Sequence, residues 1–266
     1  MKRKIKLKAA AFVFLVMVSI SVLSCKKKTT APEPAPAASN GTVFLHLHTN
    51  VDTNEVDTYN SVYVMTGGRK ISVSIAQLYI SSIQLVKTDG STVNMGGLNI
   101  AKVMPIEEYM VGSVPSGNYQ SIRFNVGLSP STNSLLPEPN DSTLSKPNMW
   151  FGNFVQPWQG YVFVNLQGKI DTSTAANNTV AQMQPFSYRI GTNSHLTSIS
   201  MPNQNYSVLP NQTQFIHIII DYSKLFNGIT LNLNSYLNVY SVADNSTVLS
   251  NQIANNIPSM FHYEQY

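Results

Sequence analysis

Apolar and polar residues alternate with a period of two through most of the chain. The alternation is clearest over residues 43–48, 71–75, 121–126 and 214–220. A period of two sends successive side chains to opposite faces of a strand, so each of these segments is expected to form a β-strand. Further strands are expected at residues 61–65, 78–87, 161–170, 187–190, 229–233 and 236–242.

Clusters of Gly, Pro, Asn, Asp and Ser separate the expected strands. The dipeptide Asp89-Gly90 predicts a short hairpin, because both central residues of a type I′ turn need positive φ. Only 11% of the residues are charged, and Asn, Ser and Thr fill the polar positions that Glu and Lys occupy on surface helices. The pattern therefore predicts an all-β fold: a single antiparallel β-sandwich with long loops.

The N-terminus has the pattern of a secretory signal. Five basic residues lie within positions 1–8, and the apolar run at 9–23 is too short to span a bilayer. The run ends at Ser24-Cys25, and Cys25 is the only cysteine in the chain. We expect a lipoprotein signal peptide at 1–24 and a lipid on Cys25; the alternative is a non-lipidated signal with an incidental cysteine.

Residues 25–40 are expected to form a Pro/Ala-rich linker between the lipid and a domain at 41–266. This organisation predicts a lipid-anchored protein of the cell envelope, in the periplasm or on the outer membrane. Beyond Lys28 the chain has nine Lys and Arg against thirteen Asp and Glu. This mildly acidic balance, without a basic stripe, argues against nucleic-acid binding.

Several short patterns occur in a familiar order along the first two thirds of the domain. They are residues 76–85, 114–127, 148–150, 158–163, 166–168 and 186–191, with Asn133 in a loop. In this order they resemble the MbnP-like family of copper-binding proteins, secreted proteins and lipoprotein domains of Gram-negative bacteria. The resemblance implies a β-sandwich that binds copper through histidines.

In some relatives a tryptophan oxidised to kynurenine by a partner haem enzyme adds a copper ligand, and imidazole suits copper. The resemblance places Trp158 and Trp150 at the two tryptophan positions of the pattern. Seven residues separate them here, where the family usually has one. Arg189 stands where the family commonly has histidine, and a guanidinium cannot ligate a metal near neutral pH.

Histidines elsewhere offer another copper site. His46 and His48 are two apart on an expected strand, so they share a face, with Cβ atoms about 7 Å apart. His195 follows the Gly191 turn and could reach the place that Arg189 leaves. The alternatives are solvated imidazoles at all three positions. His217 is expected to be an ordinary strand residue.

Motifs of catalysis are missing from the sequence, which has no Gly-x-Ser-x-Gly and no His-Glu-x-x-His. The only adjacent carboxylates, Glu107 and Glu108, are expected to form a solvated edge. We therefore expect a protein that is not an enzyme. Two functions are open: a membrane-anchored copper-binding lipoprotein, or a metal-free adhesion module that binds protein or carbohydrate and has lost the metal site.

Overall fold

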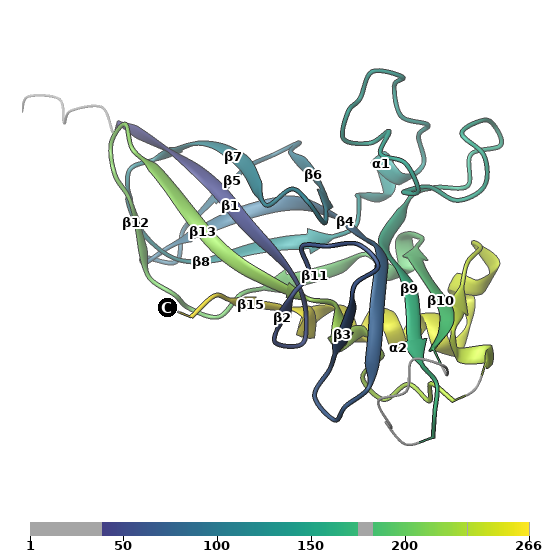
Figure 1. Ribbon diagram of the computed structural model, residues 1–266. Helices are drawn as coiled ribbons and strands as arrows, with labels where there is room; N and C mark the ends of the chain where they lie inside the picture. The colour runs from purple at the N-terminus through teal and green to yellow at the C-terminus, as the bar shows by residue number, and fades with distance from the viewer. Residues whose placement is uncertain (1–38, 175–182, 233, 266) are drawn as a thin grey trace, which may run out of the picture. The chain divides into compact units, whose positions relative to one another are not determined.

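The computed structural model describes residues 39–174, 183–232 and 234–265 (Figure 1). The predicted signal peptide, Cys25 and nearly all of the predicted linker lie outside these residues. Within them the chain is mostly β-strand, which confirms the all-β prediction. None of the helices in this part of the chain has the length and apolar composition needed to cross a membrane.

The smaller of two sheets carries the strand that begins the domain. Its strand order is β15-β13-β1-β2, and β7 also pairs with β1. The strands are β1 (Asn40–Val51), β2 (Asn54–Glu55), β7 (Glu108–Pro115), β13 (Thr213–Asp221) and β15 (Phe261–Tyr263). In Figure 1, β1 and β13 run side by side along their whole length.

The larger sheet is built around the long strand β4. Its central order is β11-β8-β4-β9-β10-β14, with four short strands attached to β4 or β8. The strands are β3 (Val62–Val64), β4 (Lys70–Lys87), β5 (Thr92–Asn94), β6 (Asn99–Val103), β8 (Gly117–Val126), β9 (Val162–Asp171), β10 (Met183–Gly191), β11 (Thr197–Ser200), β12 (Tyr206–Val208) and β14 (Asn238–Val239).

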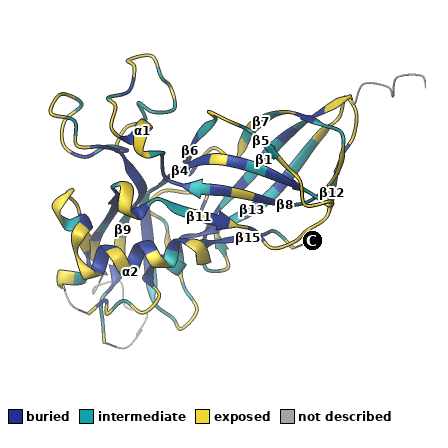
Figure 2. Cartoon of the chain, turned by 180° about the vertical axis from the view of Figure 1, so that it is seen from behind, coloured by how far each residue is buried: buried dark blue, intermediate teal, exposed yellow. Residues whose placement is uncertain are grey.

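Short helices connect the strands and cover the end of the larger sheet. They are α1 (Pro130–Asn133), α2 (Val248–Asn256) and the 3-10 turns η2 (Asn193–His195), η3 (Tyr222–Phe226), η4 (Asn234–Tyr236), η5 (Ala243–Ser246) and η6 (Ile257–Met260). Thr247 caps α2, since its side chain accepts a hydrogen bond from the Ser250 N–H. The buried side of α2 joins the core, and its outer side is exposed (Figure 2).

The two sheets share one hydrophobic core. Leu45 and Leu47 of β1 are fully buried and cluster with Leu78 of β4, Ile122 of β8 and Ile218 of β13. Each such side chain contributes about 1.5–3 kcal/mol on burial. The neighbours of Leu45 and Leu47 along β1 are only half-buried, so the predicted alternation holds here, and His46 and His48 face outward.

Several expectations about the strands need correction. Residues 71–75 and 78–87 form one strand, β4, because a bulge near Val73 lets it continue along β9. The strand expected at 229–233 is wrong: residues 229–232 form a turn after η3, and Leu231 enters the core from it. Of residues 236–242, only Asn238–Val239 pair as a strand.

Two features of the expected sandwich also differ in detail. The hairpin at Asp89-Gly90 forms between β4 and β5, but its turn is wider than type I′ and only Gly90 has positive φ, at 85°. The sheets are mixed, because β1 pairs with β13 and β10 with β14 in parallel. Parallel partners need long connections, and these strands lie far apart in the chain.

Candidate metal centre

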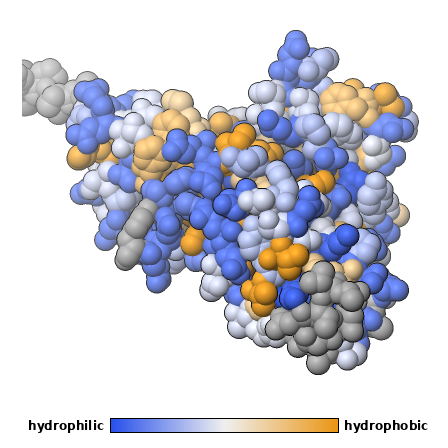
Figure 3. Space-filling model, in the orientation of Figure 1, coloured by the Kyte–Doolittle hydropathy of each residue, from blue (hydrophilic) through white to orange (hydrophobic). Residues whose placement is uncertain are grey.

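The register between β1 and β13 brings three histidines together. In this parallel pair His46 lies beside His217, and His48 lies beside Ile219. Side chains two apart on a strand share a face, so both histidines of β1 and His217 project from the outer side of the smaller sheet. Figure 3 shows hydrophilic residues gathered over the middle of this side of the molecule.

The imidazole nitrogens of this histidine cluster (His46, His48 and His217) converge. Nδ1 of His46 lies 3.0 Å from Nδ1 of His217. Each of the three residues offers one nitrogen such that all three atoms lie within 4.8 Å of one another. The centroid of the His46 ring lies 4.4 Å from that of the His48 ring and 4.7 Å from that of the His217 ring. Such spacing permits shared coordination of one ion.

The carboxylate of Glu264, directly after the C-terminal strand β15, contacts two of the three histidines. Oε2 of Glu264 lies 3.2 Å from Nδ1 of His217 and 3.5 Å from Nε2 of His48. Ligand atoms on a tetrahedral ion with bonds of about 2.1 Å are roughly 3.4 Å apart. The separations of 3.0, 3.2 and 3.5 Å are therefore close to those of atoms bound to one metal ion.

Two more carboxylates contact ring nitrogens of His46 and His48. Oε2 of Glu107 lies 3.1 Å from Nε2 of His46, and Oε1 of Glu55 lies 2.9 Å from Nδ1 of His48. A carboxylate on the remote nitrogen fixes the tautomer of a metal-binding histidine and makes the ligating nitrogen more basic. These contacts leave Nδ1 of His46 and Nε2 of His48 as the lone-pair donors.

One nitrogen in the cluster has no hydrogen-bond partner. Nε2 of His48 is buried and makes no hydrogen bond, although Glu264 lies 3.5 Å away. Leaving a buried polar atom unpaired costs about 1–3 kcal/mol, and a metal ion bound between the rings would remove that cost. His46, His48 and His217 therefore fit a first-row transition metal, and Glu264 contacts two of the three rings.

Electrostatics favour the ligating form of His217. Burial lowers its pKa, and the neighbouring ring of His46 lowers it further, while Glu264 opposes the shift. A lowered pKa keeps the imidazole neutral near pH 7, and only the neutral ring has a lone pair for a metal.

Lys102, near the end of β6, is fully buried against the turn that leads to Glu107. Its ammonium donates to the carbonyl oxygens of Val103, Met104 and Ile106 at 3.1, 3.3 and 2.6 Å. Burial lowers its pKa to about 8, although the charges of Glu107 and Glu55 act in the opposite direction. Lys102 therefore brings a positive charge close to the carboxylates that hold the histidines.

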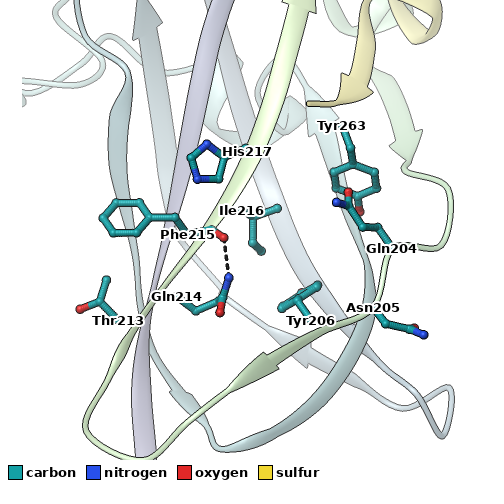
Figure 4. A pocket seen from close by; sticks show the side chains of 9 residues that line it. All are labelled: Gln204, Asn205, Tyr206, Thr213, Gln214, Phe215, Ile216, His217 and Tyr263. Carbon is teal, nitrogen blue, oxygen red and sulfur yellow. Dashed lines mark hydrogen bonds between the residues drawn. The ribbon is translucent and has the colours of Figure 1, made fainter. Parts of the chain in front are cut away.

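An open cavity of about 450 Å³ adjoins the cluster at His217. Figure 4 shows it along the part of β13 that precedes the pairing with β15, with the ring of His217 at one end. Amide and aromatic side chains line the rest: Gln204, Asn205, Tyr206, Gln214, Phe215 and Tyr263. The histidine cluster is thus approachable from solvent at this end.

The structure separates the other proposed site residues from this cluster. The ring of His195 is buried, with Nδ1 2.8 Å from the carbonyl oxygen of Gly191 and Nε2 3.0 Å from Oδ1 of Asn251. Both nitrogens thus contact protein atoms: Nδ1 contacts the end of β10, and Nε2 ties η2 to α2. His195 joins neither of the metal-compatible groups found among the described residues.

The two tryptophans belong to an aromatic group on another part of the fold. Phe154 lies between them, 4.7 Å from Trp150 and 6.0 Å from Trp158. Nε1 of Trp158 donates to the carbonyl oxygen of Asn133 at 3.0 Å, and its ring lies against Tyr161. Neither tryptophan contacts the histidine cluster.

Arg189 also makes packing contacts and hydrogen bonds within the fold. It is 9% exposed, and its guanidinium lies 5.5 Å from the ring centroid of Phe151 and 4.8 Å from that of Tyr240. It donates hydrogen bonds to the carbonyl oxygens of Trp150 and Tyr240. Arg189 belongs to β10 of the larger sheet, whereas the three histidines project from the smaller sheet.

The sequence does not predict the roles of three residues at this site: His217, Glu107 and Glu264. His217 lies on a strand as expected, but its ring contacts His46. Glu107 was expected on a solvated edge and instead contacts His46 as well. The sequence pattern gives no signal that places Glu264 at this site. The strand pattern over 214–220 places His217 on the same face as Phe215 and Ile219, and only the pairing of β13 with β1 and β15 brings it to His46 and Glu264.

Comparison with known proteins places this fold in a family. No curated protein matches the chain. Among solved structures, MbnP from Methylosinus trichosporium aligns with a TM-score of 0.48 and 14% identity, covering 84% of this chain and 97% of that chain. The MbnP family model matches residues 40–244, which is most of the sequence and includes the three clustered histidines. The chain therefore belongs to the MbnP family.

Proposed function

We propose that this protein binds copper through His46, His48 and His217. The observation that carries the proposal is the convergence of three imidazole nitrogens within 4.8 Å. His48 also has a buried Nε2 without a hydrogen bond. Imidazole is a good ligand for copper, and among divalent first-row ions copper binds most tightly to nitrogen and oxygen donors. The resemblance to copper-binding MbnP-like proteins supports the choice of metal.

The proposal includes binding and transfer of the ion rather than catalysis. Three imidazole nitrogens lie within 4.8 Å of one another, and a carboxylate oxygen of Glu264 lies beside His217 and His48, so the protein offers up to four donors. Catalytic metal sites keep a coordination position open for water or substrate, whereas closed sites fill four positions with protein atoms. Trp158 lies among Phe154 and Tyr161, so the proposed site needs neither a tryptophan-derived ligand nor a haem enzyme to make one.

We propose further that a lipid on Cys25 anchors the protein in the cell envelope. The support is the sequence: a basic segment, a short apolar run and a lone cysteine behind it. Replacing Cys25 with Ser should abolish incorporation of labelled fatty acid and release the protein from the membrane fraction. Incorporation that persists in Cys25→Ser would contradict the anchor.

The test of copper binding is a titration of the full chain, purified in detergent and carrying Cys25→Ser so that no thiol competes. Competition with chromophoric chelators of known affinity measures stoichiometry and Kd. We expect one copper ion per chain, and a loss of at least 100-fold in affinity in the double variant His46→Ala/His217→Ala.

His262→Ala is the matched control, because His262 is an exposed histidine of β15 outside the cluster. It should bind copper like the parent protein. Equal loss in His262→Ala and the double variant, or no stoichiometric binding by the parent protein, would sink the proposal and leave the metal-free adhesion module as the better account.

A further inference from the structure

We propose that the open edge of β13 binds an extended, uncharged peptide segment of another protein by strand addition. The segment lies antiparallel to β13 and continues the line of β15. This inference goes beyond the proposed function and needs no bound metal, because it follows from the way in which the two sheets meet at this edge.

Strand β15 closes only part of the edge of β13. One side of β13 pairs with β1 along its whole length, whereas β15 covers the other side only from Ile218 to Ile220. The Glu264 N–H extends this cover by one hydrogen bond, to the carbonyl oxygen of His217 at 3.3 Å. In the described part of the chain, no strand pairs with this side of β13 over residues 213–216.

The strand that precedes β13 does not fill the gap. Strand β12 pairs with β8 of the larger sheet, and from the turn at residues 209–212 β12 and β13 diverge (Figure 1). The open cavity of about 450 Å³ lies between them, lined on one side by the consecutive residues 213–217 (Figure 4). Consecutive residues of a strand belong to both of its faces, so the cavity runs along the edge of β13, where the backbone groups lie.

The backbone of β13 points hydrogen-bonding groups into this cavity. Successive residues of a strand direct their N–H and C=O groups to alternate sides. The carbonyl oxygen of Gln212 accepts from the Thr42 N–H of β1 at 2.8 Å, and that of His217 faces β15. Thr213 and Phe215 therefore direct their N–H and C=O groups away from β1. Each offers one donor and one acceptor, with the spacing that an antiparallel strand requires.

A side chain occupies the place of the missing strand. Nε2 of Gln214 donates to the carbonyl oxygen of Phe215 at 2.6 Å, as the dashed line in Figure 4 shows. This amide takes the position that an N–H of a neighbouring strand would take. An unpaired strand edge is a template for another chain, and an incoming N–H can replace a side-chain amide that is free to turn away.

The lining of the cavity defines the chemistry of the segment. Among the described residues that line it, none carries a carboxylate, an ammonium or a guanidinium group. A charge enclosed here would lack a partner, which costs free energy, so neutral residues fit. Paired residues of neighbouring strands share a face. The residue beside Phe215 therefore lies on the outer face, and the next one, beside Gln214, points toward the core side. Thr and Val suit both positions, because they favour extended backbone.

The test measures the fluorescence anisotropy of a short blocked peptide of alternating Thr and Val, labelled through a Gly/Ser tail. The protein is the full chain with Cys25→Ser, purified in detergent and kept in EDTA. We expect saturable binding, because main-chain hydrogen bonds supply the affinity in strand addition and tolerate many sequences. The same peptide with an N-methylated backbone loses its donors and should bind at least about 10-fold more weakly.

Variants at the edge sharpen the test. Thr213 is exposed and its N–H faces away from β1, so Thr213→Pro removes this donor without removing a hydrogen bond to β1. It should weaken peptide binding by roughly 3- to 10-fold, whereas Thr213→Ala keeps the N–H and should bind like the parent. Gln214→Ala should bind about 2- to 5-fold more tightly, because no side-chain amide then competes for the Phe215 carbonyl oxygen.

Three outcomes would overturn strand addition: no saturable binding by the parent protein, equal binding of the plain and N-methylated peptides, or equal binding by Thr213→Pro and Thr213→Ala. Far-ultraviolet circular dichroism spectra that match the parent would show that the variants are folded. Because every measurement is made in EDTA, the result is independent of copper binding at the histidine cluster.

Discussion

Nδ1 of His46 lies 3.0 Å from Nδ1 of His217, although 171 positions separate the two residues in the chain. The contact exists because β1 and β13 pair in parallel with these residues side by side. An unfolded chain cannot hold the two rings together, so any ion bound between them binds the folded state alone. Metal binding must then stabilise the fold by mass action.

Thermal unfolding tests this linkage. At a free Cu(II) concentration of about 100 times Kd, binding stabilises the folded state by about 2.7 kcal/mol, which should raise Tm by roughly 5–10 °C in a domain of this size. His217→Ala should remove most of the increase, and His262→Ala should keep it. Scanning calorimetry with and without Cu(II) measures the difference. An equal increase in His217→Ala would show that copper binds elsewhere.

Glu107 and Glu108 are neighbours in sequence but differ in environment. The carboxylate of Glu107 contacts Nε2 of His46, and Glu108 is exposed on β7. Loss of a carboxylate that orients a metal-binding histidine typically costs 10- to 100-fold in affinity. We expect that loss in Glu107→Gln, with one copper ion still bound per chain, and parent-like affinity in Glu108→Gln, both measured by competition titration. Equal affinities in the two variants would mean that Glu107 does not act through His46.

The sequence pattern was sufficient to place His46 and His48 on the outer face of β1. Side chains alternate between the two faces of a strand, so burial of Leu45 and Leu47 leaves the histidines on the outer face. It could not place His217 beside them. The period of a strand says which face a residue takes, but not which strand pairs with it. The same limit explains why Glu264 was missed: its position depends on a three-residue strand at the C-terminal end of the chain.

The resemblance to the family located the fold better than it located the site. Its motifs lie mainly on β4, β8, β9 and β10, the strands of the larger sheet. The histidine cluster lies on the smaller sheet, where the quoted motifs are sparse. Arg189 and His195 were therefore weighed at positions that belong to other packing interactions.

The buried Lys102 gives the protein a pH dependence on the alkaline side. Its pKa is about 8 in the folded protein and about 10.5 in an unfolded chain, so between these values the unfolded state holds more protons. The free energy of unfolding should rise with pH in this window, by roughly 1–3 kcal/mol in total. Denaturant unfolding between pH 7.5 and 9.5 measures the slope below the range in which the tyrosines ionise.

Lys102→Met should abolish this slope, and Lys87→Met, at the half-exposed end of β4, should retain it. A slope of the same size in Lys102→Met would assign the pH dependence to other groups.

Gly168 tests the packing of β9 on β4. A Cβ at this position would come within 1.9 Å of the carbonyl oxygen of Ser72, a backbone atom that cannot move without breaking the strand pairing. Gly168→Ala should lower the free energy of unfolding by roughly 3–5 kcal/mol. Gly96→Ala is the control, because nothing lies within 4 Å of its added Cβ. Denaturant unfolding compares the two, and equal stabilities would show that β9 and β4 are farther apart than described.

Arg189 allows a direct test of where the metal site lies. If its guanidinium only fills space over Phe151 and Tyr240 and donates to the Trp150 carbonyl oxygen, Arg189→Met should lower the free energy of unfolding by roughly 1–3 kcal/mol. Copper affinity should then change less than about 3-fold, since no contact joins Arg189 to the histidine cluster.

Arg189→His restores the residue that the family commonly has at this position, and it sharpens the comparison. With the site on the smaller sheet, the new imidazole is too remote to add a ligand, so affinity and the Cu(II) electron paramagnetic resonance spectrum should match those of the parent. A gain of more than about 10-fold, which corresponds to about 1.4 kcal/mol, with a changed spectrum would place the copper site at β10 instead. In that case His46 and His48 would be solvated histidines on the outer face of β1, as the alternative interpretation of the sequence holds.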